Sequence, residues 1–106
     1  MSNYLLIYSG VGWDILPSSA KEQARDAWSS WFQQLGSAVV DRGNPVGGGQ
    51  AKTISDEGNV TDPPFTITGY SILQAESFEA AVSLAKSCPL LSSSGQVSVV
   101  ELVPEM

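Results

Sequence analysis

The chain has 106 residues, the length of one ordinary domain, which leaves no room for a second hydrophobic core. Eleven acidic and five basic residues give a formal net charge of −6, which would repel a nucleic-acid backbone or an anionic lipid surface. Hydrophobic residues make up 42% of the sequence, yet no apolar run approaches the roughly 20 residues that span a bilayer. We therefore expect a single domain over residues 1–106, with neither nucleic acid nor a membrane as its partner.

The ends of the chain and its cysteine usage favour a cytoplasmic protein. Residues 1–4 carry no basic stretch ahead of an apolar one, so no secretory signal is predicted. Cys88 is the only cysteine, whereas small exported domains usually carry paired cysteines. The sequence has no histidine and no carboxylates clustered at ligand spacing. We therefore predict no metal site and no cofactor, and expect Cys88 to be a buried, unreactive thiol.

The first part of the chain predicts a strand followed by a helix. Residues 4–8, Tyr-Leu-Leu-Ile-Tyr, are typical of a strand that is buried on both faces. Ser19 and Glu22 have the spacing of a capping box, and Gly36 can adopt the left-handed conformation that ends a helix, so we predict a helix over 19–35. Its apolar residues recur every three or four positions and are Ala24, Ala27, Trp28, Trp31, Phe32 and Leu35.

The middle of the chain predicts short strands separated by turns. Residues 38–41 favour an extended segment, and 42–49 are dense in glycine and other turn formers. A hairpin is predicted over 51–61, because the sequence Asp-Glu-Gly-Asn in its middle is typical of a tight turn. After Pro63-Pro64, which cannot donate to a strand ladder, residues 65–73 predict a central strand.

The last part of the chain predicts a second helix and a final strand. Ser77 is a good N-cap, and Phe78, Ala81, Val82 and Ala85 would form the buried face of the helix that follows. Residues 96–103 then predict a strand. The order strand, helix, strands, helix, strand is that of the ferredoxin-like βαββαβ unit. We therefore predict an α+β fold in which both helices cover one face of an antiparallel sheet.

The predicted sheet carries apolar residues on both of its faces. The first strand is apolar throughout, and the last one has Val97 and Val99 on one side with Val100 and Leu102 on the other. Two helices cover only one face, so the second face would stay exposed as a large apolar patch. A second copy of the chain, packed sheet to sheet about a two-fold axis, would bury that patch, so we expect a homodimer.

Five short motifs along almost the whole chain resemble the YCII-related proteins, in particular the group with an Asp-Gly-Pro-Phe signature. The motifs are Tyr4-Leu-Leu-Ile-Tyr8, Asp41-Arg-Gly-Asn-Pro45, Thr61-Asp-Pro-Pro-Phe65, Gly69-Tyr-Ser71 and Val97-Ser-Val-Val-Glu-Leu102. The resemblance implies a dimeric α/β barrel built from ferredoxin-like subunits, which agrees with the architecture expected from the residues.

This sequence departs from the family in two ways that bear on function. The activities suggested for the family rely on a histidine paired with an aspartate, and this chain has no histidine, so it cannot perform such chemistry in that way. Pro63 stands where the family signature has glycine, which replaces a permissive φ angle with a fixed one.

Several polar and aromatic residues are candidates for a site, each with a structural alternative. Asp62 matches the signature aspartate and could act as a base or anchor a ligand, or could only stabilise the turn before the prolines. Tyr8 and Tyr70 could present their hydroxyls to a ligand, or could simply pack in the sheet. Arg42 and Asn44 could hold an acidic or polar ligand, or could be solvated loop residues. The predicted ligand-binding set is Tyr8, Arg42, Asn44, Asp62 and Phe65, and the candidate catalytic pair is Asp62 and Tyr70.

The hypothesis favoured by the sequence is a dimeric protein that binds a small polar or aromatic molecule. Its cleft would lie between the sheet and the loops at 42–49 and 61–65, near the dimer interface. One alternative is a cofactor-independent lyase or isomerase, in which Asp62 moves a proton while Tyr8 or Tyr70 stabilises developing negative charge. The other alternative is a non-catalytic structural or accessory subunit.

Overall fold

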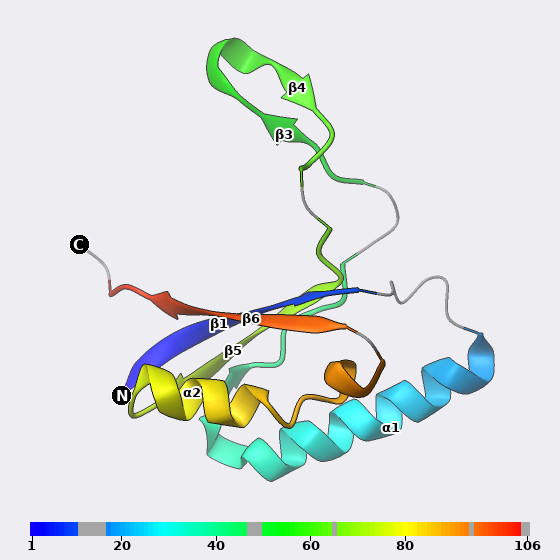
Figure 1. Ribbon diagram of the computed structural model, residues 1–106, viewed down its shortest axis with the longest axis vertical. Coiled ribbons are helices and arrows are strands. Elements are labelled where there is room, and N and C mark those ends of the chain that lie inside the picture. Colours follow the sequence, from blue (N-terminus) through cyan, green and yellow to red (C-terminus); the bar gives the residue numbers. More distant parts are fainter. Residues whose placement is uncertain (11–16, 47–49, 65, 94, 105–106) are drawn as a thin grey trace.

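A four-stranded antiparallel sheet with two helices on one side makes up the body of the chain (Figure 1). The computed structural model describes residues 1–10, 17–46, 50–64, 66–93 and 95–104. The strands of the sheet are β1 (Ser2–Ser9), β2 (Val39–Asp41), β5 (Gly69–Ala75) and β6 (Gln96–Leu102), and they lie in the order β2-β5-β1-β6. The predicted α+β class with an antiparallel sheet is confirmed.

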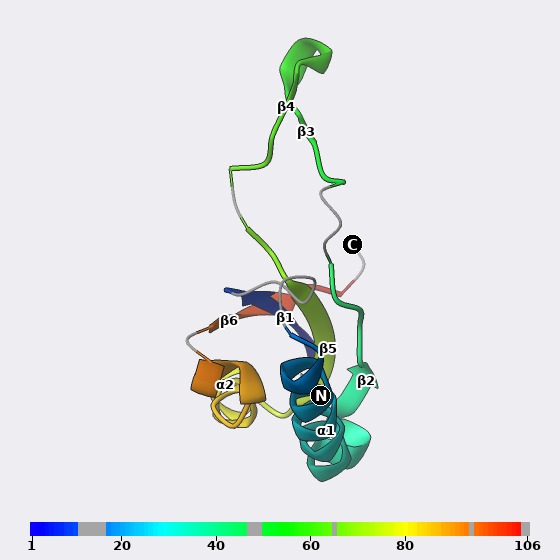
Figure 2. The same cartoon turned by 90° about the vertical axis from the view of Figure 1, so that its right-hand side faces the viewer.

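The two helices lie on the same side of the sheet, as the two perpendicular views show (Figures 1 and 2). They are α1 (Ser18–Leu35) and α2 (Phe78–Ala85), and short 3-10 segments follow them at Gly36–Ala38 and Pro89–Ser93. Among the described residues, no helix is long and apolar enough to cross a bilayer.

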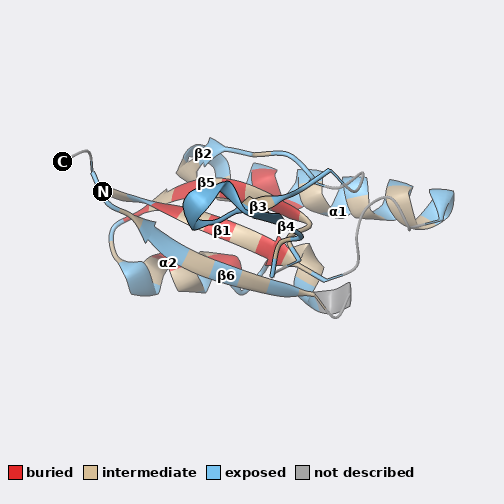
Figure 3. Cartoon of the chain, turned by 90° about the horizontal axis from the view of Figure 1, so that it is seen from above, coloured by how far each residue is buried: buried red, intermediate tan, exposed pale blue. Residues whose placement is uncertain are grey.

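The core lies between the helices and the inward side of the sheet. Figure 3, which looks onto the sheet from the opposite side, shows buried and partly exposed positions alternating along β1 and β5. This alternation follows from the two-residue period of a strand, which directs successive side chains to opposite faces. The buried apolar cluster consists of Tyr4, Leu6, Tyr8, Trp31, Phe32, Leu73, Ala75, Ala81, Ala85 and Cys88.

No described helix lies on the outward side of the sheet (Figure 1), and the strand register directs apolar side chains to that side. The strand register places Leu5 between Ile72 and Val100, and Ile7 next to Tyr70. We call this surface the open face and define it by Leu5, Ile7, Tyr70, Ile72, Val100 and Leu102. The two-sided apolar pattern predicted for the last strand is confirmed, since Val97 and Val99 pair with the inward-facing Tyr8 and Leu6.

Residues 50–64 form an arm that stands away from the body on the side of the open face (Figures 1 and 2). Its two short strands, β3 (Thr53–Ile54) and β4 (Val60–Thr61), pair only with each other, which confirms the predicted hairpin. The 3-10 turn Asp56–Gly58 joins them, and Glu57 adopts a positive φ of 67° there. The arm exposes two large apolar side chains, Ile54 and Val60.

The capping box expected at the start of the first helix is not formed. The helix begins at Ser18 with Pro17 as its N-cap residue, and no side chain caps it. Ser19 therefore lies inside the first turn, where its hydroxyl is past the position from which a cap accepts a backbone N–H. The predicted end is confirmed, because Gly36 takes a positive φ of 57° and its N–H bonds back to Phe32.

Two further details differ from expectation: the start of the central strand and the burial of Phe78. The central strand, predicted over 65–73, is Gly69–Ala75 in the structure, and just before it Thr68 donates to the carbonyl of Tyr8 and accepts from the N–H of Val46. Phe78, expected on the buried face of the second helix, is 45% exposed. It is the first residue of α2, beside Tyr4 at the margin of the core. The predicted cap of that helix is confirmed, since Ser77 accepts from the N–H of Ala80.

Candidate functional site

A groove of about 850 Å³ lies between α1, one end of the sheet and the loop at 42–45. Residues 20–32 of α1 form one side, and the facing side comes from Tyr8, residues 68–71 and Pro89-Leu90. The volume falls within the range of about 300–1,000 Å³ that is usual for small-molecule sites.

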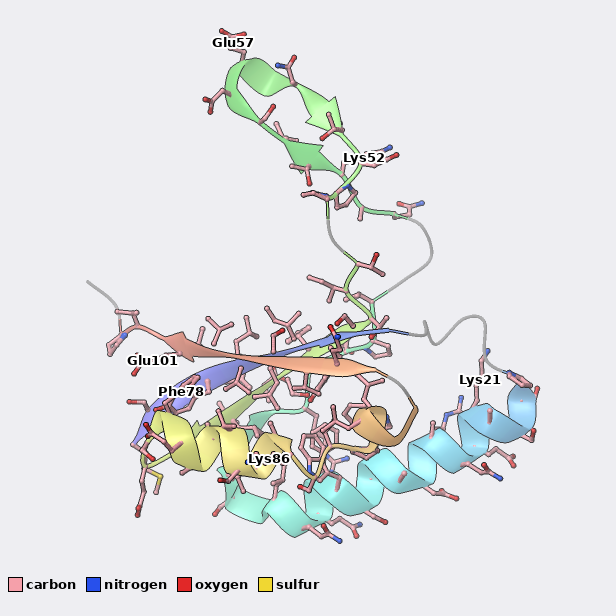
Figure 4. The ribbon with its side chains drawn as sticks, in the orientation of Figure 1. Lys21, Lys52, Glu57, Phe78, Lys86 and Glu101 are labelled. Carbon is pink, nitrogen blue, oxygen red and sulfur yellow. The ribbon has the colours of Figure 1, made fainter. Side chains whose placement is uncertain are left out.

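The groove exists because α1 is longer than the sheet it packs against. An 18-residue helix is roughly 27 Å long. Its buried aromatic residues, Trp31 and Phe32, lie near its C-terminal end. The first turns of α1 reach beyond the end of the sheet, as Lys21 in Figure 4 illustrates, and the small side chains of Ala24 and Ala27 line the groove.

The floor of the groove is a chain of two hydrogen bonds that joins three separate segments. The Tyr8 hydroxyl donates to Ser71 Oγ at 2.7 Å, and Ser71 Oγ donates to the backbone carbonyl of Arg42 at 2.6 Å. Ser71 is fully buried, so these bonds satisfy a polar group that would otherwise be costly to bury. The Ser71 bond also ties the start of the 42–45 loop to β5.

Burial sets the protonation state of Tyr8. Desolvation raises the pKa of the Tyr8 hydroxyl far above its usual range, a nearby Cys88 adds to that rise, and the hydrogen bond to Ser71 opposes it. The hydroxyl is therefore neutral at physiological pH, and its proton is held by Ser71. Tyr8 can contribute a polar, uncharged edge to the groove but cannot act as a general base.

Gly43 lets the 42–45 loop lie directly against β5. Its φ of +76° is one that residues with a side chain rarely adopt, and a Cβ there would overlap the carbonyl oxygen of Tyr70. Its N–H donates to Asp41 Oδ1 at 2.8 Å, and Pro45 forms a β-bridge with Gly69. These contacts fix the backbone from which the Arg42 and Asn44 side chains project.

Aromatic rings line the groove in direct contact with one another. The ring of Trp28 lies 4.8 Å from that of Tyr8 in an edge-to-face arrangement and 5.8 Å from that of Phe32. The guanidinium carbon of Arg42 lies over the Phe32 ring, 5.2 Å from its centroid. The groove thus combines an apolar aromatic surface with a cation held at its edge.

The structure brings four of the predicted site residues to one place. Tyr8, Arg42, Asn44 and Tyr70 all line the groove. Tyr70, however, pairs with Ile7, so its side chain is directed to the open face and its backbone to the loop, where its N–H bonds to the carbonyl of Asn44.

Asp62 lies elsewhere. It is on the arm, its side chain is 86% exposed, and it pairs with Lys52 at 2.8 Å. Within one chain it does not line the groove, and neither do the other described residues of the 61–65 loop. Phe65 lies outside the described residues. The two loops expected to share a cleft are therefore separated by the projection of the arm from the body.

Sequence reasoning missed one contributor to the groove and favoured only a core role for another. Trp28 packs against the core, as its place on the apolar stripe predicts, and it also lines the groove. Ser71 was overlooked, although it is the one polar residue at an inward position among the buried residues described. A lone serine in an otherwise apolar inward series is the signal that could have identified it.

The thiol of Cys88, the remaining titratable candidate, is buried and protonated. Cys88 is 3% exposed, and burial raises the pKa of its thiol to about 11, opposed in part by a backbone hydrogen bond from Leu90. The expected buried thiol is confirmed. Within the described ranges, no three His, Cys, Asp or Glu residues gather as a metal site would require.

Comparison with protein-family models, with curated proteins and with solved structures found no match to this chain. The functional argument therefore depends on the groove and on the surfaces around it.

Proposed function

We propose that this chain is a small-molecule-binding protein of the YCII-related type, and that the groove beside α1 holds a small polar or aromatic ligand. The observation that carries the proposal is the groove itself, in which an aromatic side formed by Trp28 and Phe32 faces the hydrogen-bonded floor at Tyr8 and Ser71. Mostly apolar concave sites with a few placed polar groups are the usual form of ligand pockets.

The proposal includes a ferredoxin-like subunit. In support of it, the strand order β6-β1-β5-β2 has the first and third strands of a βαββαβ unit at the centre, once the β3–β4 arm is set aside as an insertion. All neighbouring strands in that sheet are antiparallel.

The proposal also includes a homodimer that packs through the open face. The chain exposes 7288 Å², about 1,600 Å² more than the roughly 5,700 Å² expected for a folded monomer of this mass. An excess of that size matches what each subunit of a permanent homodimer buries. The neighbouring apolar side chains of Leu5, Ile72 and Val100 on the open face suit the apolar core of a permanent interface.

The arm supports the same dimer. It stands on the side of the open face, where a second sheet stacked on the first would lie (Figures 1 and 2). An isolated hairpin with only two pairs of strand residues has marginal stability in water, and this one exposes Ile54 and Val60. A second copy stacked on the open face would lie alongside both arms and give these side chains a surface to pack on.

The ligand proposal is tested by a thermal-shift screen with cyclic ketones, phenols and aromatic acids, since a ligand of the native state raises its melting temperature. A hit should shift the indole N–H resonance of Trp28, and Trp28→Ala should weaken binding at least about tenfold. Phe78→Ala is the control, because Phe78 is a partly exposed aromatic on α2, away from the groove (Figure 4). A panel with no binder, or binders indifferent to Trp28, would contradict the proposal.

The dimer proposal is tested by sedimentation at micromolar concentration. Val100→Lys should yield a monomer, because it puts a charge on the open face, next to Leu5. Phe78→Lys should leave the dimer intact, and it is a matched control because Val100 is 44% and Phe78 45% exposed in the single chain. A wild-type protein that sediments as a monomer would overturn the proposal.

We do not extend the proposal to a lyase or an isomerase. The candidate proton acceptor, Asp62, is solvent-exposed and paired with Lys52 on the arm, and Tyr8 holds its proton too tightly to serve in its place. A structural or accessory subunit would need no groove, so the ligand screen also distinguishes that alternative.

A further inference from the structure

The charge of the groove differs from that of the chain as a whole. The sequence has eleven acidic residues against five basic ones, and Arg25 and Arg42 are its only arginines. Both arginines line the groove, and no aspartate or glutamate is among the described residues that do so. The charged side chains among the described lining residues are thus both cationic, in contrast to the acidic chain as a whole, and such side chains attract a negatively charged ligand.

The position of Arg42 favours a planar, two-oxygen anion. Because its guanidinium lies over the Phe32 ring, the ring occupies one face of the group and leaves the N–H edges available. Those edges match the two oxygens of a carboxylate in a bidentate arrangement. Among the described residues, Arg42 makes no ion pair, so no described carboxylate competes for them.

The backbone of Arg42 is held independently of its side chain. Ser71 Oγ donates to its carbonyl at 2.6 Å, and the next residue, Gly43, is wedged against Tyr70. A fixed backbone reduces the entropy lost when the side chain binds an anion, which favours affinity.

The rest of the groove suits a flat apolar body. Trp28 presents its ring next to those of Tyr8 and Phe32, and Ala24, Ala27 and Leu90 complete the apolar surface. A ring bound there would contact Trp28 while its acidic group reached Arg42, because both residues contact Phe32.

We infer that the groove binds planar aromatic monocarboxylates, with the carboxylate on the Arg42 guanidinium and the ring against Trp28. This inference rests on the proposed ligand-binding function and specifies its ligand class. It predicts that charge, and not only ring shape, determines which molecules bind.

The test is an NMR titration of the whole chain with four probes that share one ring system: 1-naphthoate, the neutral 1-naphthamide, the cationic 1-naphthylmethylamine and 1-naphthyl phosphate. We expect 1-naphthoate to shift the Trp28 indole signal and to bind at least about tenfold more tightly than the amide, because hydrogen bonds to charged groups are the stronger ones. Arg42→Gln should remove this preference by weakening the acid alone, and Arg42→Lys should retain part of it.

Lys52→Gln is the matched control. It removes the same unit of positive charge, but from the arm, where Lys52 is 62% exposed and pairs with Asp62 (Figure 4). It should leave the affinity for 1-naphthoate unchanged.

Each other outcome overturns the inference. Equal binding of the amide, or an acid preference that survives Arg42→Gln, would contradict the role of charge while leaving groove binding intact. Tighter, Arg42-dependent binding of the phosphate would replace the carboxylate with a phosphate ligand. If no probe shifts Trp28 but other compounds of the broader screen do, the ligand class is wrong and the proposed function stands; if none does, both fail.

Discussion

The hydrogen bond between Tyr8 and Ser71 joins two residues whose substitution should destabilise the protein by different amounts. Ser71→Ala should destabilise the protein by about 2–3 kcal/mol, because it leaves the buried Tyr8 O–H without an acceptor and the Arg42 carbonyl without its donor. Tyr8→Phe should cost only about 1 kcal/mol, since Ser71 keeps its bond to Arg42. Urea unfolding of both variants measures the difference. If the two variants lose equal stability, the hydrogen bonds do not run from Tyr8 to Ser71 and from Ser71 to the Arg42 carbonyl.

Cys88 provides a pH prediction at the same scale. Its pKa in the folded protein is about 11, above the ordinary 9.0, so between these values the thiol ionises in the unfolded chain but not in the folded one. The stability it contributes is complete below pH 9 and is lost as the pH rises through 11. Cys88→Ala should therefore lose less stability than the wild type between pH 9 and pH 11. Parallel pH profiles of unfolding free energy would contradict this.

Among the helices, the two N-termini differ in how they are stabilised. Ser77 caps α2 through the N–H of Ala80 at 3.1 Å, so Ser77→Ala should cost about 1 kcal/mol. Ser19 lies in the first turn of α1 and caps nothing, so Ser19→Ala should change stability by less than about 0.5 kcal/mol. Thermal unfolding of the two variants compares them directly. A comparable loss at Ser19 would mean that the capping box forms in solution.

The arm and α1 are the elements whose role depends on what surrounds them. The hairpin signal in 51–61 was sufficient to predict β3 and β4, because a tight turn is a local property. No local signal indicated that the hairpin would stand apart from the sheet rather than extend it. The same holds for α1, whose length was predicted correctly but whose overhang depends on where β1 and β5 end.

For the whole molecule, charge and the proposed interface combine into one prediction. Each subunit carries a net charge of −6, while the open face has no charged residue among those that define it. Two such subunits repel each other, and salt screens that repulsion without breaking any ion pair across the open face. The dimer dissociation constant should therefore fall several-fold between 20 and 200 mM NaCl. Sedimentation equilibrium measures it, and weaker association at high salt would indicate interfacial ion pairs instead.

Local sequence patterns were enough to predict the elements that depend on neighbours along the chain. The apolar runs at residues 4–8 and 96–103, the cap at Ser77 and the helix stop at Gly36 are local features, so these elements could be predicted before any tertiary contact was known. The sequence also offered Tyr8, Arg42 and Asn44 as candidates, but each had a structural alternative, as a packed sheet residue or a solvated loop residue, that local sequence could not exclude.

Which of these candidates form a site depends on how distant parts of the chain pack together. Tyr8 and Ser71 are separated by 63 positions, and Ser71 and Arg42 by 29, so the chain of hydrogen bonds in the groove depends on strand pairing and a loop contact that no periodicity encodes. The same long-range geometry directed Tyr70 to the open face and carried Asp62 outward on the arm. A pattern in sequence specifies the face of an element, but the distance between two elements depends on how the whole chain packs.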